Sequence, residues 1–472
     1  MLSGDQVAHI HEQAVGFLNT DGVKVLLPEA RDLLESAGAS VDGDIVTLVP
    51  SMVTDALDSA PSEFVLHARN PDNSLHIGGT STNFVSVGGP PFASDAERGR
   101  RAGAMSDFVE FMKLCQSFDV IHSLAPCVEA TDVPVGLRHV ETTRAQLTLT
   151  DKVPYIYARG RKHVRDCLDM ISIVHGIDDD GLRERPVTWS NINTNSPLQL
   201  DVPMCMGIID CARVNQPVIM TPFTLAGAMA PVTLAGALVL QHIEALFAIT
   251  LSQVANPGAP VVYGAFTSNV DMKSGSPAFG TPEAMKGAFA SGQLARHIGL
   301  PWRSSGSSAS NAVDAQGGYE TMINTYGAVM GGADIVLHAA GWQEGGLTAS
   351  MEKFITDVEM LQILAESMQP VVVDDDELAL DAIRDVGPGG HFFGTQHTLD
   401  RFETAFYEPI VFSRANFEQW EEDGSKQTDE RATEVWKRVL ADYEPPPIDS
   451  AVSAQLDDFV ERATAEGGSP PD

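Results

Sequence analysis

The residue types that could do chemistry gather where short apolar runs end. These ends include "NINTNSP", "FTSNVDMKSGSPAFG", "GSSASNAVDAQ" and "HAAGWQEGG", which are rich in Gly, Ser, Thr and Asn and hold few ionisable groups. Several of them also carry an aromatic residue. Hydrolysis needs a nucleophile with a base and an orienting acid, whereas aromatic faces attract an organic cation. The segments therefore favour a binding site for an organic cation over a hydrolase.

No familiar catalytic motif competes with this interpretation. The sequence contains no G-x-S-x-G elbow, no H-E-x-x-H and no cluster of His and Cys with zinc-ligand spacing. The five cysteines form no C-x-x-C pair, so we expect buried free thiols. Glu344 is better explained as a solvated loop acid than as a general base, and Asp271, Asp314 and Glu320 fit helix caps or loop anchors. The sequence assigns no catalytic residue and no metal ligand.

These segments are positioned by an alternation of strands and helices. Between residues 81 and 367, eight short apolar runs alternate with longer helical stretches. Eight such units predict an α/β protein with a (β/α)8 barrel, the TIM barrel, whose strands end at one common mouth. The predicted strands are 83–89, 120–127, 154–159, 187–194, 217–223, 260–268, 301–308 and 334–341.

Two further segments flank the predicted barrel. Residues 1–80 combine helical patterning with short strands, and residues 368–472 have the pattern of a mainly helical extension. The final "AEGGSPPD" is expected to fray, as chain ends often do.

The chain is strongly acidic, with a formal net charge of −34. This charge excludes nucleic acid as a partner, because a phosphate backbone requires Lys and Arg on the binding surface. A surface of this kind repels itself in dilute buffer and is relieved by salt, since the Debye length falls to about 3 Å at 1 M. We therefore expect a salt-rich cytoplasm, with an ordinary acidic bacterial enzyme as the alternative.

The sequence also carries no membrane or export signal. No segment has 18 consecutive apolar residues, and "MLSGDQVAHIHEQ" lacks the basic and apolar regions of a signal peptide. The expectation is a cytoplasmic protein with no membrane partner.

Four blocks carry a resemblance to a known family. They are "YGAFTSNVDMKSGSPAFGTPE" (263–283), "GSSASNAVDAQGGYE" (306–320), "HAAGWQEGGLTASMEKFITD" (338–357) and "GPGGHFFGTQHTLDRF" (387–402). With them the chain resembles the trimethylamine methyltransferase family of corrinoid-dependent enzymes. The resemblance implies a (β/α)8 barrel that moves a methyl group from a methylated amine to the Co(I) of a separate corrinoid protein.

One departure from the family pattern bears on the substrate. The family's archetype has a pyrrolysine in the segment that matches "GSSASNAVDAQ", where this chain has ordinary residues. A quaternary ammonium is already charged, so its methyl can be displaced and a neutral amine leaves, whereas a tertiary amine must first be activated. The resemblance is thus to members without pyrrolysine, which act on betaines, and glycine betaine is the favoured substrate.

A betaine site needs aromatic faces for the cation and donors for the carboxylate. Each aromatic face contributes on the order of 1 kcal/mol. The aromatic candidates at strand ends are Trp342, Phe266, Phe223, Phe84 and Trp189. The donor candidates are His338, Asn191, Asn193, Ser307 and Arg159. For His338 a core histidine bonded to backbone stays an alternative, and for Trp342 simple packing at the barrel top. Gly345 and Gly346 would let the backbone turn tightly beside Trp342.

The cofactor is expected on a partner. The chain has no D-x-H-x-x-G of the kind corrinoid carriers use, so cobalamin would arrive on a corrinoid protein that docks over the mouth. Two alternatives stay open: the same chemistry on carnitine, proline betaine, γ-butyrobetaine or trimethylamine, and a non-catalytic betaine-binding protein on the same barrel. The C-terminal extension could also support a homo-oligomer.

Overall fold

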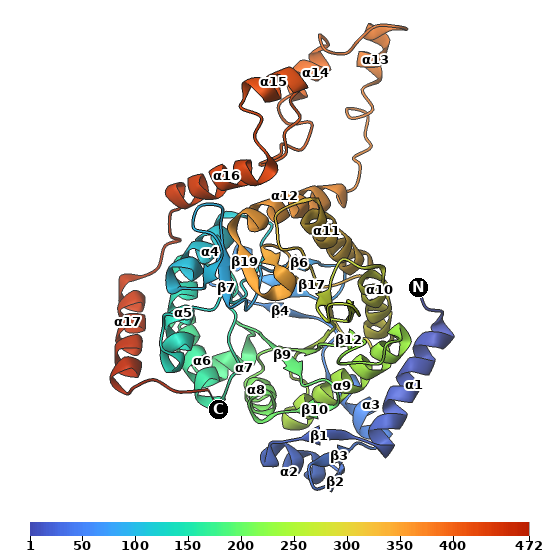
Figure 1. Cartoon of the computed structure of the whole chain (residues 1–472), viewed down its shortest axis with the longest axis vertical. Helices are drawn as coiled ribbons and strands as arrows, with labels where there is room; N and C mark the ends of the chain where they lie inside the picture. The colour runs from blue at the N-terminus through green and yellow to red at the C-terminus, as the bar shows by residue number, and fades with distance from the viewer. Residues whose placement is uncertain (472) are drawn as a thin grey trace.

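The predicted barrel is present in the computed structural model, which describes residues 1–471 (Figure 1). Six parallel strands pair in the order β6-β17-β16-β13-β11-β9. They are β6 (Asn83–Phe84), β9 (Ser190–Thr194), β11 (Val218–Pro222), β13 (Val261–Gly264), β16 (Trp302–Ser305) and β17 (Ile335–Leu337). Strands β11, β13 and β17 are mainly apolar because both faces of a parallel barrel sheet are covered, whereas β9 and β16 also carry polar side chains.

Two of the eight predicted strands close the ring through single bridges. The parallel bridges join Val85 to Ser123, Ser123 to Val153, and Tyr155 to Trp189. The segments 120–127 and 154–159 therefore hold the second and third positions of the barrel, although they pair too briefly to form regular strands.

One helix follows each barrel strand and packs outside the ring. These helices are α4 (Met105–Ser117), α5 (Val135–Leu149), α6 (Arg161–His175), α8 (Val202–Arg213), α9 (Leu234–Ala255), α10 (Pro282–His297), α11 (Ala315–Met330) and α12 (Met351–Ser367). A short α7 (Asp179–Glu184) precedes the fourth strand. Helix α9 is long and apolar enough to cross a bilayer, but 78% of its most apolar window is buried inside the protein. It is therefore a helix of the protein core.

The N-terminal residues cover one side and the base of the barrel. Helices α1 (Gly4–Thr20) and α3 (Pro50–Ser59) pack on α9, and α2 (Pro28–Ser36) packs nearby. A small sheet combines β1 (Val23–Val25), β2 (Ser40–Asp42) and β3 (Ile45–Thr47) with β10 (Gln199–Leu200). The hairpin of β4 (Phe64–Leu66) and β5 (Leu75–Ile77) shares the core inside the ring with residues such as Trp189 and Ile219.

Short strands decorate the mouth. One sheet has the order β18-β19-β7-β8, and another the order β12-β14-β15. Their bounds are β7 (Phe92–Ser94), β8 (Arg101–Ala102), β12 (Leu225–Ala226), β14 (Ser268–Val270), β15 (Pro277–Ala278), β18 (Trp342–Gln343) and β19 (Thr348–Ser350). The mouth is thus framed by paired backbone rather than by free loops.

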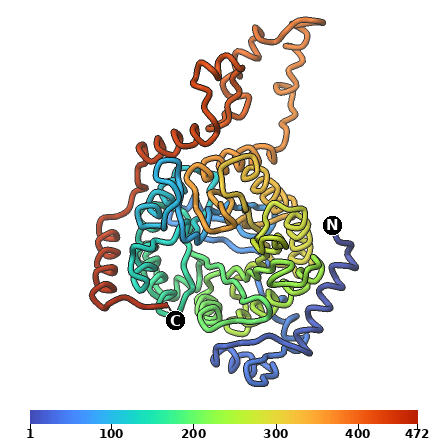
Figure 2. Tube along the Cα trace, in the orientation of Figure 1, coloured from blue at the N-terminus to red at the C-terminus, as the bar shows by residue number. Residues whose placement is uncertain are grey.

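The C-terminal residues leave the barrel and return to it (Figure 2). Helix α16 (Thr428–Asp442) packs on α12 and α4, and α17 (Ser450–Ala465) packs on α5 and α6. Near the end of the chain, the Ser469 N–H donates to the Gly136 carbonyl of α5 at 2.8 Å, and the Ser469 carbonyl lies 2.7 Å from Nε2 of His163 in α6. The segment predicted to fray thus contacts the barrel helices at Ser469. Between α12 and α16 lie three short helices, α13 (Leu380–Val386), α14 (Gln396–Arg401) and α15 (Phe417–Glu422).

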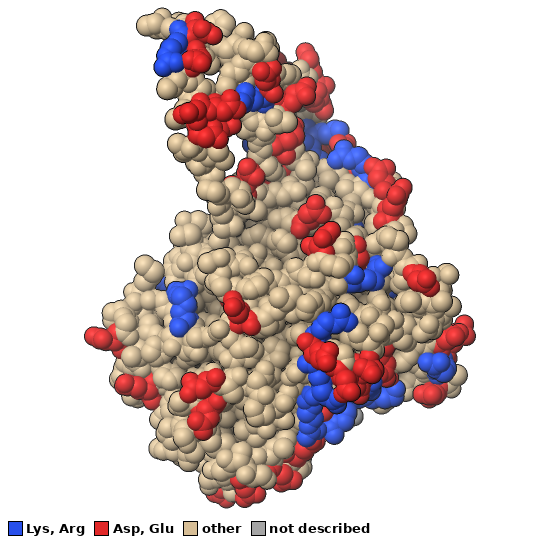
Figure 3. Space-filling view, turned by 180° about the vertical axis from the view of Figure 1, so that it is seen from behind, with Lys and Arg blue, Asp and Glu red and all other residues tan. Residues whose placement is uncertain are grey.

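The surface repeats the acidity of the sequence. Acidic side chains are spread over the face in Figure 3, and many basic side chains on that face lie beside acidic ones. Ion pairs such as Arg161 with Glu29 and with Asp210, and Arg213 with Glu29, neutralise cations locally. The net charge of −34 is therefore balanced by counter-ions in the solvent and not by groups of the protein.

If this acidity is an adaptation to salt, the protein should become more stable as salt screens it. We expect the melting temperature to rise between 0.1 M and 2 M KCl, because the Debye length shrinks from about 10 Å to below 3 Å and self-repulsion falls. Thermal unfolding followed by circular dichroism across this range measures it. A flat or falling profile would contradict adaptation to a salt-rich cytoplasm.

Candidate functional site

A cavity of about 460 Å³ opens at the mouth of the barrel, among the ends of its strands. Seven residues that the sequence singles out line it: Trp342, His338, Phe266, Phe223, Asn191, Asn193 and Arg159. They come from five different strand ends, so the parallel barrel is what brings them together.

An aromatic cluster forms one wall of this cavity. The Phe266 ring lies 5.0 Å from the Phe223 ring and 6.0 Å from the Trp342 indole, with Phe266 and Trp342 nearly perpendicular at 80°. Behind the wall, Phe279 stacks on Phe266 at 5.3 Å. Ring faces held in this way present negative π density to a cation and need no hydrogen bond from it.

Trp342 is held in place by shape. A Cβ on Gly346 would lie 2.3 Å from the indole, and Gly346 has a φ of +100°, so a side chain there is excluded twice. Within the described chain the indole Nε1 donates to no protein group, although a buried Trp usually finds a partner. The position of the Trp342 indole is therefore fixed by close packing against the Gly346 backbone and not by a hydrogen bond.

His338 takes a strained backbone conformation at the end of β17. Its φ is +59°, which is uncommon for a residue with a side chain and often marks a functional position. Its Nδ1 accepts a hydrogen bond from the Gly88 N–H at 3.1 Å, which leaves the proton on Nε2. Burial, with the nearby Arg303 charge, holds the pKa of His338 well below its usual value. His338 is therefore a neutral donor rather than a cation.

Arg303 is a buried cation without an anion. It lies in β16, lines the cavity and is 1% exposed. No Asp or Glu among residues 1–471 pairs with it; its Nε has no partner, and Nη1 reaches only the Ala265 carbonyl at 3.5 Å. Burial lowers the pKa of the guanidinium to about 9. An unpaired buried charge is costly, so this side chain is suited to an anion that enters the cavity.

Arg159 has the opposite surroundings at the rim. It is 48% exposed and pairs with Glu129 at 3.0 Å. The same carboxylate also binds Arg138 and accepts from the Tyr157 hydroxyl. Because Arg159 is half exposed to water and already has a carboxylate partner, it has less to gain from a ligand carboxylate than Arg303.

The two asparagines join a polar chain along the neighbouring strands. Asn191 donates to the Asn193 side chain at 2.7 Å and accepts from the Thr221 hydroxyl at 2.7 Å. Asn193 is exposed at the mouth. Both amides can reorient toward a polar ligand.

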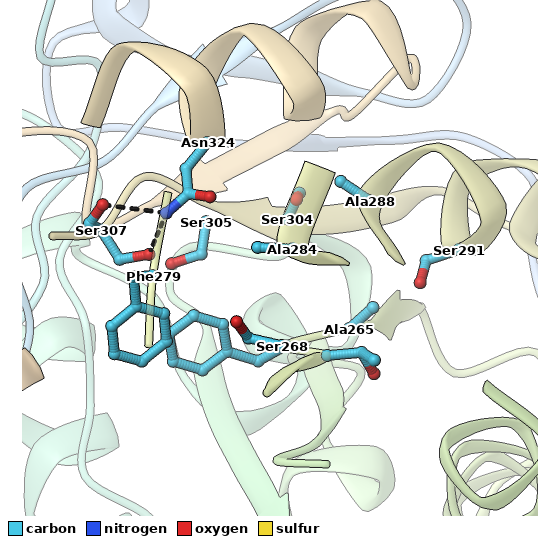
Figure 4. Close-up of a pocket in the computed structure, with 12 residues that line it drawn as sticks. Ala265, Ser268, Phe279, Ala284, Ala288, Ser291, Ser304, Ser305, Ser307 and Asn324 are labelled. Carbon is cyan, nitrogen blue, oxygen red and sulfur yellow. Dashed lines mark hydrogen bonds between the residues drawn. The ribbon is translucent and has the colours of Figure 1, made fainter. Parts of the chain in front are cut away.

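Three residues that the sequence singles out lie outside this cavity. Phe84 stacks with His122 in the core, because its position in β6 turns it away from the cavity. Trp189 stands at the start of β9, inside the ring, where Nε1 donates to Ser123 Oγ at 3.0 Å. Ser307 borders a separate cavity of about 20 Å³ (Figure 4).

That small cavity is part of the scaffold behind the aromatic wall. In Figure 4 the Asn324 amide donates to both oxygen atoms of Ser307. The same segment is ordered by Glu320, which accepts from Ser308 Oγ and from the N–H groups of Ala309 and Ser310 at 2.8 to 3.0 Å. Glu320 is therefore a loop anchor, one of the two roles the sequence suggested.

The other acids that the sequence singles out also have structural partners. Asp271 anchors its own loop by accepting from the Ser274 N–H at 3.0 Å and the Ser274 hydroxyl at 2.7 Å. Glu344 pairs with Arg100 at 2.9 Å, and Asp314 caps α11 by accepting from the Gly317 N–H. The five cysteines are buried and free, as predicted. Within residues 1–471 no group of three or more His, Cys, Asp or Glu side chains could hold a metal ion.

Sequence reasoning missed the floor of the cavity. Arg303, Tyr155 and Leu337 line it, and each lies within a predicted strand or immediately beside its end. Arg303 could have been found from the sequence, because it lies within the predicted strand "PWRSSGSS". A charged residue in a strand that is buried on both faces requires a partner, which can be a ligand.

Comparisons with known proteins define the class. The profile of the family described as trimethylamine methyltransferase (MTTB) matches residues 1–468. The glycine betaine methyltransferase of Desulfitobacterium hafniense (strain Y51) is 36% identical over 470 residues, which cover 99% of this chain and 98% of that protein. The trimethylamine methyltransferase MttB of D. hafniense (strain DSM 10664 / DCB-2) is 31% identical over 471 residues, covering 99% of this chain and 94% of that protein.

A solved structure supports the fold. The crystal structure of the Methanosarcina barkeri monomethylamine methyltransferase (MtmB) matches 97% of this chain and 88% of that one, with a TM-score of 0.50 and 10% identity. Fold and relatives together define a methyltransferase on a (β/α)8 barrel. The chain belongs to the trimethylamine methyltransferase family.

Proposed function

We propose that the protein transfers a methyl group from glycine betaine to the Co(I) of a separate corrinoid protein. The observation that carries the choice of substrate is Arg303, a cation buried at the floor of the cavity with no carboxylate partner in the described chain. A betaine brings the missing carboxylate, whereas trimethylamine would leave the guanidinium unpaired. His338 Nε2–H adds a neutral donor beside it.

The cationic end of the substrate would face the aromatic wall. Phe223, Phe266 and Trp342 supply ring surface on the order of 1 kcal/mol each. A neutral His338 does not repel the trimethylammonium group. Carboxylate at the floor and ammonium at the wall together orient the substrate along the cavity.

This orientation suits displacement at a methyl group. With the carboxylate held below, a methyl group points toward the opening, where the corrinoid protein would dock. The methyl carbon bonds to cobalt as its C–N bond breaks, and the electron pair stays on nitrogen, so dimethylglycine leaves with a neutral amine. The protein contributes positioning and exclusion of water, and a well-oriented displacement gains several kcal/mol from these alone.

The ordinary residues in segment 306–311 agree with such a substrate. The segment is occupied by small side chains fixed by Glu320, and no ionisable side chain from it lines the cavity. A quaternary amine needs no further activation before its methyl group is displaced.

Longer betaines form the alternative. Carnitine, proline betaine and γ-butyrobetaine also carry a cation and a carboxylate, and the volume of about 460 Å³ leaves room for them. A non-catalytic betaine-binding protein would use the same contacts without a corrinoid partner.

Calorimetric titration in high KCl tests the substrate class. The panel is glycine betaine, carnitine, proline betaine, γ-butyrobetaine, trimethylamine and choline, the last of which has a hydroxyl in place of the carboxylate. We expect glycine betaine to bind about 100-fold more tightly than choline or trimethylamine, about 3 kcal/mol, because these two lack the carboxylate. The relative affinities of the longer betaines decide the substrate within the class. Choline binding as tightly as glycine betaine would refute carboxylate recognition, and a longer betaine binding most tightly would change the substrate.

The proposed contacts also predict the pH dependence of binding. The pKa of His338 lies well below 6.5 and that of Arg303 is lowered only to about 9, so neither titrates between pH 6 and 8. We expect the affinity for glycine betaine to change little in this range and to fall as the pH rises through about 9, where half of the guanidinium groups of the ligand-free protein have lost their proton. Titrations at several pH values measure it. A steep change between pH 6 and 7 would contradict a neutral His338.

A further inference from the structure

Residues 368–427, termed the arm below, leave the barrel after α12 and return at α16 (Figures 1 and 2). Because α16 packs along α12, both ends of the arm are fixed to the body. Its own helices, α13, α14 and α15, have only six or seven residues each. The arm is therefore an anchored excursion and not a free tail.

The arm exposes far more apolar surface than its size explains. Four of its phenylalanines, Phe393, Phe402, Phe406 and Phe417, are between 62% and 85% exposed. Its other exposed apolar residues are Met368, Val371, Val372, Val373, Leu378, Leu380, Ile383, Phe392, Leu399 and Phe412. Exposed apolar side chains in this number on one anchored segment point to an interaction surface.

A second apolar surface lies on α11. Tyr319, Met322, Tyr326 and Met330 are all exposed, and their spacing of three, four and four residues places them on one face of the helix. This face, the α11 stripe, adjoins the root of the arm because α11 packs beside α12.

We propose that two copies of the chain pair about a two-fold axis, with the arm of each covering the α11 stripe of the other. A two-fold pair buries both arms and both stripes at once with one kind of contact. In each copy the arm extends away from its own barrel (Figure 2). The net charge of −34 on each copy opposes pairing, so the attraction must come from apolar contact, and salt that screens the charge should strengthen it.

The available area is sufficient for a stable dimer. At about 200 Å² for a fully exposed ring, the four phenylalanines expose about 600 Å². Two arms double this to about 1,200 Å², the lower bound for specific interfaces, before the aliphatic residues and the stripes are counted.

Sedimentation equilibrium of the full chain tests the pairing in 0.1 M and 2 M KCl. We expect a particle of twice 50.5 kDa. Phe393→Asp with Phe406→Asp in the arm, and Tyr326→Asp on the stripe, should each weaken association at least 100-fold. The matched control is Val232→Asp, which adds the same charge at a side chain 69% exposed elsewhere, and it should leave the dimer intact.

A cross-link then tests which surfaces meet. Copies with Phe406→Cys are mixed with copies carrying Met322→Cys and treated with a bismaleimide; the five native cysteines are buried and free. We expect a covalent hetero-pair. A monomer at both salt concentrations, a dimer that the arm or stripe variants leave intact, or the absence of a cross-link would overturn the proposal. Glycine betaine titration of each variant confirms that the barrel is folded.

Discussion

Arg303→Gln should abolish most of the affinity for glycine betaine. The substitution leaves the substrate carboxylate buried without a cation, a loss of about 3 kcal/mol or roughly 100-fold in Kd. The same change should raise the free energy of unfolding of the ligand-free protein, because it removes a buried charge that has no carboxylate partner within residues 1–471. Calorimetry and chemical unfolding measure the two effects on one protein.

Arg303→Gln is expected to lower the affinity for glycine betaine and to raise the stability of the ligand-free protein. These opposite changes distinguish a role in carboxylate recognition from general damage to the fold. A structural role for Arg303 would lower both stability and affinity. The matched control is Arg159→Gln, which removes an arginine that also lines the cavity but is 48% exposed and already paired with Glu129. Its Kd for glycine betaine should change less than about threefold. Equal losses in the two variants would contradict the assignment of the carboxylate to Arg303.

Trp342→Ala should weaken glycine betaine binding by about 1 to 2 kcal/mol, or roughly 5- to 30-fold, because one face of the cation site is lost. Trp342→Phe keeps a ring and should recover most of this loss. Both variants should stay folded, since the strands and helices of the barrel do not depend on this indole, although the melting temperature of Trp342→Ala should fall. Binding is measured by calorimetry and folding by circular dichroism.

An aromatic residue outside the cavity supplies the comparison. Phe84→Leu shortens a buried ring that stacks on His122 and does not line the cavity. It should lower stability without changing the Kd. If Trp342→Ala leaves the affinity for glycine betaine unchanged, the indole is a packing residue at the barrel top and has no part in the cation site.

The architecture could be predicted because a parallel barrel has a strong local signal. Each strand is an apolar run followed by a helix of different period, so the order of all eight positions follows from the chain. The exact pairing does not: 120–127 and 154–159 close the ring through isolated bridges, which depend on their neighbours in space. Residues 368–427 were predicted as part of a mainly helical extension, but they form only three helices of six or seven residues, and their course depends on what they pack against.

The candidate site could be predicted only in part, because the sequence shows where the strands end but not how every side chain is placed. Residues at strand ends, such as His338 and Phe266, are found from the rule that barrel chemistry lies at the C-terminal mouth. Phe84 lies elsewhere because a strand alternates its faces, and a shift of one residue reverses the direction of a side chain. Trp189 shares a face with Asn191 and Asn193 but lies just before β9 begins, so it packs inside the ring below the mouth. Arg303 was missed because its importance lies in the absence of a nearby carboxylate, which only the packed structure reveals.

The most direct test of the proposed function is a single-turnover methyl transfer. The protein is mixed with glycine betaine and a corrinoid protein reduced to Co(I), and dimethylglycine and the corrinoid spectrum are followed together. We predict dimethylglycine in proportion to the methylated cobalt, with the rate greatly reduced in Arg303→Gln. Tight binding of glycine betaine with no transfer to any corrinoid protein tested would contradict the proposed reaction and favour a betaine-binding protein.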